Sequence, residues 1–383
     1  MIANGSRIPY VQSSASLEVP PPYHFPGVTV NAFVWEAPID RVQAYCDRHF
    51  NLGDEASRGF VYRPLAAWPY ATLMVMEYPV MISTTTAPPE VGETPYSDRG
   101  VVSQTEVFVA LPVMRYGRGL PGLVTDTTLN CTLPFIVVGN PMSCVSGREM
   151  VGLGKLLAEI TTGEGKFPGS FKSTVKLPGW GAPGQGTRQE MLQFMELDTG
   201  PILPTFRMGS PAQTSLATLF QSREAGWFMD SLTSALNLVD SSSSGLLPTS
   251  MRTVGLKQYR DAVDPARAIY QALVSCRSHY ANMRDFAFYD ERDVKIQFQD
   301  TGSFHDILSV FLPLGDKPSG QLVPIAAKAG MRFTADIDFD EMRVIHEFAI
   351  DRQGGLPPIP ATSNLTARWF RPIRGFFGPR RPV

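Results

Sequence analysis

Charged side chains are scarce in this 383-residue sequence, at 18% against about 25% in an average soluble domain. The 34 lysines and arginines nearly balance the 36 aspartates and glutamates, so the chain lacks the excess of positive charge that nucleic-acid binding requires. A hydrophobic content of 43% excludes a disordered chain and predicts a large core. We expect a globular protein that binds no nucleic acid, and the low charge favours a homo-oligomer whose subunit contacts cover part of the surface.

Cysteines and histidines are few and scattered. The four cysteines, Cys46, Cys131, Cys144 and Cys276, form no C-x-x-C pair, so no zinc site of the usual spacing is present. The five histidines belong to no H-E-x-x-H motif, and no G-x-S-x-G serine accompanies them. No apolar run approaches the 18 or so residues that span a membrane, and the N-terminus lacks a signal-peptide core. These absences predict a cytoplasmic protein with free thiols and no membrane span.

Glycine and proline are abundant by contrast, with 33 of each, and this density of backbone breaks leaves little room for long helices. Strands are expected where apolar residues alternate or form short β-branched runs. These segments are residues 105–113, 124–133, 134–140, 294–299 and 331–348, and a run that begins at Trp68.

Three segments have helical patterns, at residues 37–51, 215–238 and 264–276. The last is the best signalled, because Asp264 can cap a helix whose first residue is Pro265. Helices and strands together favour an α+β fold dominated by antiparallel sheet.

Some patterns resemble known sites but have a simpler interpretation. The segments GRGLPG at 117–122 and GWGAPG at 179–184 fit the G-x-G-x-x-G pattern of dinucleotide loops. Each has a proline where the following helix should begin, so we interpret both as turns. Three alternating aspartates at 336–340 are expected on the solvent face of a strand, and Glu341 replaces the glycine that a calcium loop needs. The sequence therefore predicts neither a dinucleotide nor a metal site.

The most informative segment is GREMVGLGKLLA at residues 147–158. Together with TEVFVALPV at 105–113, it resembles the acetoacetate decarboxylase family, in which a G-R-E segment precedes the catalytic lysine and a T-E strand carries an active-site glutamate. The resemblance matches Lys155 to the Schiff-base lysine and Glu106 to the glutamate. It implies an antiparallel α+β fold wound as a cone or double β-barrel around the lysine, in a homo-oligomer without a cofactor.

The residue types suit this chemistry. A lysine amine attacks a ketone only when neutral, and with an ordinary pKa of about 10.4 few lysines are neutral at pH 7. In GLGKLL the neighbours of Lys155 are apolar, and burial among them would disfavour the charged amine. The resulting iminium makes decarboxylation, aldol cleavage or loss of a β-hydroxyl accessible, with Glu106 moving the proton. Considered without the resemblance, Lys155 would be a surface lysine of an Ala/Leu helix.

Three further residues are candidates for supporting the site. Arg148 and Glu149 are expected to form an ion pair that holds the turn, or alternatively to touch the substrate. Arg115, just after the T-E strand, is the candidate for a cation that the family supplies elsewhere.

The chain also departs from the family pattern. Leu153 and Gly154 replace an aromatic-proline pair. Leu156 stands where the family has a second lysine, Val28 where it has an arginine for the substrate carboxylate, and Thr72 where it has another glutamate. We therefore expect a lyase, of decarboxylase, aldolase or dehydratase type, for a keto acid or ketone less polar than acetoacetate. The alternative is a relative that has lost the chemistry and binds a hydrophobic small molecule.

The chain is expected to have three parts. Residues 1–21 form an N-terminal arm, and residues 22–351 form a single acetoacetate decarboxylase-like domain with an insertion at about 165–250. Residues 352–383 form a basic, aromatic C-terminal tail.

Overall fold

The computed structural model of the chain describes residues 19–86, 95–98, 100–118, 124–181, 184, 186–202 and 250–348. The helix expected at 215–238, the tail at 352–383 and all but the end of the arm at 1–21 lie outside the described residues.

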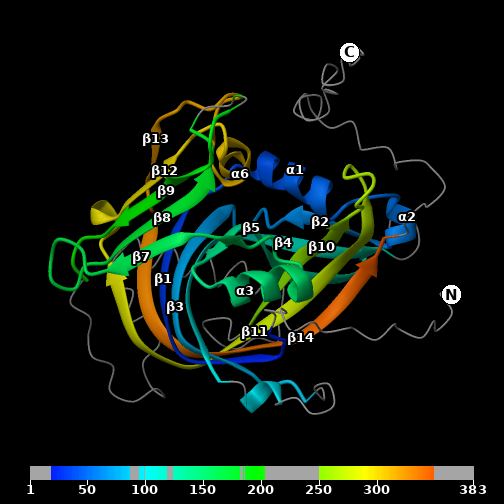
Figure 1. The fold of residues 1–383 in the computed structure, drawn as a ribbon, viewed down its shortest axis with the longest axis horizontal. Coiled ribbons are helices and arrows are strands. Elements are labelled where there is room, and N and C mark those ends of the chain that lie inside the picture. The colour runs from blue at the N-terminus through cyan, green and yellow to red at the C-terminus, as the bar shows by residue number, and fades with distance from the viewer. Residues whose placement is uncertain are drawn as a thin grey trace, which may run out of the picture.

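Seven long strands pair side by side into a closed ring (Figure 1). The pairing is antiparallel except for a short parallel contact between β10 and β5, and β5 pairs back with β4 to close the ring. In order, the ring strands are β4 (Val102–Arg118), β3 (Tyr70–Ser83), β1 (Tyr23–Glu36), β14 (Ala329–Glu347), β11 (Ala268–Tyr289), β10 (Ser250–Arg260) and β5 (Val124–Val138). Two short strands extend it: β2 (Phe60–Pro64) pairs with β4, and β6 (Leu156–Leu157) pairs with β5.

A second, five-stranded antiparallel sheet stands at one side of the ring (Figure 1). Its strands, in spatial order, are β13 (Leu322–Ile325), β12 (Lys295–Gln299), β9 (Glu190–Asp198), β8 (Lys172–Gly179) and β7 (Glu159–Gly163). The described part of the segment expected as an insertion thus supplies β8 and β9, the middle of this sheet.

Helices are short in the part of the chain that the structure describes. They are α1 (Ile39–His49), α2 (Glu55–Arg58), α3 (Pro141–Ser146) and α6 (His305–Phe311), with single turns η1 (Tyr96–Asp98), η2 (Gly147–Val151) and η3 (Glu291–Asp293). Among the described residues, no helix is long and apolar enough to cross a membrane. All four cysteines are free thiols, as expected.

Both faces of the ring strands are apolar, and they pack against different partners. On β4, Val107 and Val109 face a core shared with the smaller sheet, α1 and α6. Their neighbours Phe108 and Ala110 belong to a second core inside the ring. Because successive side chains of a strand point to opposite faces, Glu106 shares the inner face with Phe108. This alternation directs the side chain of Glu106, on the predicted T-E strand, toward the interior of the ring.

The predicted fold class is confirmed: antiparallel sheet dominates, and a ring of strands surrounds the interior. The helix at 37–51 and the strands at 105–113, 294–299 and 331–348 are present, as is the strand after Trp68.

The helix predicted at 264–276 is wrong, because these residues begin the long strand β11. Asp264 instead stabilises the β10–β11 turn, where its side chain accepts a hydrogen bond from the backbone N–H of Ala266 at 3.2 Å. The capping signal was therefore that of a turn, and pairing of β11 with β10 and β14 overrides local helical preference.

The two strands predicted at 124–133 and 134–140 are one strand, β5. Its register against β4 shifts between the Val109–Phe135 and Leu111–Thr132 pairs. Pro134 falls in this irregularity, where a residue that cannot donate a hydrogen bond does not end the strand.

Candidate active site

A small cavity of about 70 Å³ lies inside the ring. It has room for roughly five water molecules, which is the size of a short-chain carbonyl compound. Its walls come from β1, β3, β4, β5, β10, β11, β14 and the α3–η2 turn. They consist of Tyr23, Phe25, Met76, Tyr78, Met81, Gln104, Glu106, Phe108, Leu133, Ile136, Ser143, Ser146, Gly147, Val151, Leu153, Lys155, Met251, Thr253, Ser278, Tyr280, Ile337 and Phe339.

A compact turn delivers Lys155 to this cavity. Helix α3 begins after Asn140, whose side chain caps the N–H groups of Met142 and Ser143. The chain then widens into the π-helical turn η2, which ends at Gly152 with a left-handed φ of 74°. This reversal lets the Lys155 side chain lie back across Gly147, where a Cβ would come within 2.4 Å of the lysine Cδ. Lys155 is consequently buried. It is not the exposed lysine of a surface helix, which was the other interpretation of the segment.

The lysine amine meets Glu106 at the centre of the site. Nζ of Lys155 lies 3.0 Å from Oε1 of Glu106 and 3.2 Å from the hydroxyl oxygen of Ser143. Lys155 is 7% exposed and Glu106 5% exposed, so this ion pair is almost entirely removed from water. Transfer of one proton along the 3.0 Å contact would convert two buried charges into a neutral amine and a carboxylic acid. The pair therefore combines a nucleophile with a group that can take its proton.

Two phenols lie beside the carboxylate. Burial raises the pKa of Tyr78 well above its ordinary value of 10.0, and the negative charge of Glu106 raises it further. Burial also raises the pKa of Tyr280, and Glu106 again contributes. Both hydroxyls therefore remain protonated, and that of Tyr78 donates a hydrogen bond to the sulfur of Met76 at 3.2 Å.

Arg148 and Glu149 do not form the expected ion pair. Both are exposed, and Nη1 of Arg148 donates instead to the backbone carbonyl of Lys155 at 2.9 Å. The backbone carbonyl of Glu149 accepts a hydrogen bond from the Tyr259 hydroxyl at 2.8 Å. Arg148 thus holds the turn through the backbone, next to the lysine but outside the cavity lining.

Arg115 lies away from the cavity. Its Nη1 pairs with Asp126 at 2.8 Å, and its guanidinium covers the ring of Phe60 at 5.1 Å. It is nine residues beyond Glu106 on a strand, and an odd separation points it to the opposite face. The structure therefore brings Lys155 and Glu106 together, keeps Arg148 and Glu149 at the turn, and separates Arg115 from them.

The three positions matched to the family's charged residues do not line the cavity. Leu156 is 39% exposed, and Val28 and Thr72 are not among the lining residues. On the strands of Val28 and Thr72, the lining side chains include the uncharged Phe25 and Met76.

Several polar lining residues were missed from the sequence, among them Gln104, Ser143, Tyr78 and Tyr280. A signal existed for Gln104, which lies two residues before Glu106 on the same strand and so shares its face. The others come from elements that only the ring brings together. Tyr78 and Gln104 also line an outer groove formed with Glu77, Ser103 and Asn140.

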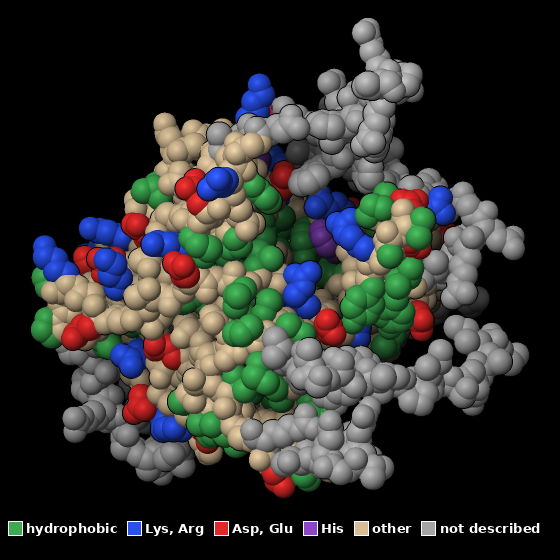
Figure 2. Space-filling model, in the orientation of Figure 1, with side chains coloured by type: hydrophobic (Ala, Val, Ile, Leu, Met, Phe, Trp, Pro, Cys, Tyr) green, Lys and Arg blue, Asp and Glu red, His purple; other side chains and the backbone are tan. Residues whose placement is uncertain are grey.

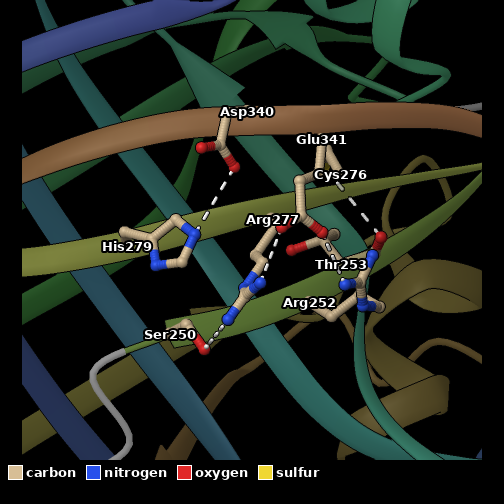
Figure 3. A network of polar contacts seen from close by, with 8 residues as sticks. All are labelled: Ser250, Arg252, Thr253, Cys276, Arg277, His279, Asp340 and Glu341. Carbon is tan, nitrogen blue, oxygen red and sulfur yellow. Dashed lines mark hydrogen bonds and ion pairs between the residues drawn. The ribbon is translucent and has the colours of Figure 1, made fainter.

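One cluster has the residue types of a metal site. Ligand atoms of His279, Asp340 and Glu341 lie within 4.8 Å of one another. Figure 3 shows Glu341 directed at two arginines, with its carboxylate oxygens 2.9 Å from Arg252 and 2.6 Å from Arg277. These guanidinium groups already neutralise the carboxylate and would repel a metal cation. The cluster is best described as an ion-pair network that joins β10, β11 and β14.

No family model matches the sequence, and no curated protein resembles it at the sequence level. Solved structures do resemble it. Acetoacetate decarboxylase from Legionella pneumophila subsp. pneumophila str. Philadelphia 1 aligns with a TM-score of 0.50 and 10% identity over 90% of this chain and 94% of that one. The enduracididine biosynthesis enzyme MppR, complexed with pyruvate, gives 0.48 and 12% over 87% and 93%. Another acetoacetate decarboxylase structure gives 0.47 and 12% over 88% and 93%.

Proposed function

We propose that this chain, which has the acetoacetate decarboxylase fold, is a cofactor-independent lyase that forms a Schiff base between Lys155 and a ketone or keto acid. The observation that carries the proposal is the buried contact of 3.0 Å between the Lys155 amine and the Glu106 carboxylate, both of which line the cavity. A surface lysine has neither the burial nor the proton acceptor.

The first step is formation of the iminium. Glu106 takes a proton from Nζ, and the neutral amine adds to the carbonyl carbon of the substrate. Glu106 then returns the proton to the departing oxygen, so that one water leaves as the carbon–nitrogen double bond forms. The hydroxyl of Ser143, 3.2 Å from Nζ, helps to orient the amine for attack.

The iminium then draws electrons from a bond one carbon away. Loss of carbon dioxide, aldol cleavage and loss of a β-hydroxyl all pass through the same enamine, after which a proton is added and water releases the product. The protonated hydroxyl of Tyr280, which lines the cavity, can donate a hydrogen bond to an oxygen atom of the substrate during these steps.

The test is reductive trapping. Wild-type protein is incubated with 4-methyl-2-pentanone or acetoacetate and cyanoborohydride, which reduces iminium ions selectively, and the modified lysine is located by peptide mass mapping. We expect the adduct on Lys155 and its complete loss in Lys155→Met. Lys257→Met is the matched control, since burial lowers the pKa of Lys257, yet this residue does not line the cavity.

Two results would count against the proposal. Adduct on other lysines but never on Lys155 would show that the amine is not a nucleophile. Saturable binding of a hydrophobic ketone without a reducible adduct would indicate the alternative, a protein that keeps the fold and binds a small molecule without reacting.

A further inference from the structure

The cavity contains one positive and one negative side chain and no other charge among its described lining residues. These are Lys155 and Glu106, and they neutralise each other at 3.0 Å. The remaining polar groups are uncharged hydroxyls and one amide. Among the described residues, the site therefore has no spare cation for a substrate carboxylate.

Three described arginines on the elements that line the cavity, or next to Lys155 in the turn, are engaged elsewhere. Arg148 is exposed and bound to the backbone of Lys155. Arg115 is paired with Asp126, and Arg252 with Glu341. None of the three lines the cavity.

A carboxylate entering this space would be an unpaired buried charge. Schiff-base formation does not supply a partner, because the iminium replaces the ammonium and Glu106 already balances it. Burial of an ion without a partner is strongly unfavourable, and Glu106 would repel it as well. Only a neutral substrate leaves the charge of the cavity unchanged.

The polar lining suits a neutral ligand. Oε1 of Gln104 is buried and has no hydrogen-bond partner among the described residues. It lies on the same face of β4 as Glu106. A buried acceptor without a partner is matched by a hydroxyl or N–H donor, which a neutral ligand can carry.

We propose that the substrate of this site is an uncharged carbonyl compound, an aldehyde or ketone without a carboxylate. The inference rests on the proposed Schiff-base function. It excludes decarboxylation and leaves aldol cleavage or loss of a β-hydroxyl. In aldol cleavage, Glu106 takes the proton of the β-hydroxyl, the carbon–carbon bond electrons pass to the iminium nitrogen, and an aldehyde leaves the enamine.

Two probes of matched shape test the proposal. In 4-methyl-2-pentanone an isopropyl group replaces the carboxylate of acetoacetate, so the two ketones differ mainly in charge. Each is trapped with cyanoborohydride, and occupancy at Lys155 is divided by occupancy at the exposed Lys317 in the same digest, which corrects for intrinsic reactivity. We expect the ratio to be at least about tenfold higher for the neutral ketone.

A gain-of-function variant provides the second measurement. Gln104→Lys adds a cation to the cavity and should raise the acetoacetate ratio above that of the wild type. If this variant does not fold, as judged by circular dichroism, the wild-type comparison still decides.

The outcomes separate the two proposals. Adduct on Lys155 with equal or greater preference for acetoacetate would overturn the neutral-substrate inference and leave the Schiff-base function standing. No adduct on Lys155 with either probe would overturn the function itself. A wild-type preference for the neutral ketone, reversed or reduced by Gln104→Lys, supports both.

Discussion

At the scale of single residues, the ion pair of Lys155 and Glu106 combines two roles that substitution can separate. Lys155 is needed to form the adduct, whereas Glu106 moves protons before and after it forms. An enamine exchanges protons at the carbon beside the former carbonyl, so exchange of these protons with solvent reports proton transfer without knowledge of the natural substrate.

We therefore predict that Glu106→Gln slows this exchange more than it slows adduct formation. Exchange of 4-methyl-2-pentanone protons in deuterated water, followed by NMR, should fall about 100-fold, within the range for loss of a general acid or base. The trapped adduct on Lys155 should persist.

The matched control is Glu77→Gln. This carboxylate accepts a hydrogen bond from Thr162 at 2.6 Å and lines the outer groove instead of the cavity. Its substitution should leave exchange unchanged. Equal exchange rates in Glu106→Gln and the wild type would show that another group transfers the proton.

At the scale of elements, the α3–η2 turn positions the amine. Gly147 has an ordinary helical φ of −63°, so its backbone accepts any residue. What restricts it is space, because a Cβ there would lie 2.4 Å from Cδ and 2.6 Å from Cε of Lys155. The glycine provides room for the lysine side chain.

Gly147→Ala should therefore keep the fold but displace the amine from Glu106. We expect trapping at Lys155 to fall about 100-fold, as for a reacting group misplaced by about 1 Å. Gly154→Ala is the control in the same turn, where no atom lies within 4 Å of the added Cβ. Equal trapping by the two variants would mean that the lysine reaches the site by another path.

At the scale of the whole molecule, helix α1 connects the core between the two sheets to the edge of the ring. Val42, Cys46 and Phe50 are buried in that core, and α1 contacts both α6 and β2. Figure 2 shows hydrophobic side chains between charged ones on the face drawn, in keeping with the low charge of the sequence. The homo-oligomer expected from that low charge remains a prediction.

His49, at the end of α1, should make the stability of the molecule depend on pH. Burial lowers the pKa of His49 to about 4, against an ordinary value of 6.5. Between these values the unfolded chain binds a proton that the folded chain does not, so the free energy of unfolding falls as pH decreases through this window. Above pH 6.5 the contribution is fully present.

Urea denaturation between pH 4 and 7.5 measures this effect. His49→Gln should flatten the curve relative to the wild type, because it removes the buried imidazole whose pKa is lowered. Parallel curves for the wild type and His49→Gln would show that the histidine titrates alike in the folded and unfolded states.

The sequence indicated much of the architecture, because short-range patterns reflect which faces are buried. Period-two apolar residues predicted β12 and β14, and the T-E segment predicted β4 with Glu106 on it. Prediction from the sequence failed at β11, because a local turn signal at Asp264 resembled a helix cap. Pairing with strands distant in sequence determined the structure there. The sequence also could not show that Arg115 faces away from the site.

The sequence by itself determined which chemical groups are available. These are one lysine with apolar neighbours after the G-R-E segment, one glutamate on a strand, and little other charge. Only the tertiary structure decided that they meet. Closure of the ring brings β4, β11 and the α3–η2 turn to one cavity, and alternation along each strand selects Glu106, Gln104 and Tyr280 for its inner face. The physical reason is that side-chain direction follows from local geometry, whereas proximity depends on strand pairing between distant parts of the chain.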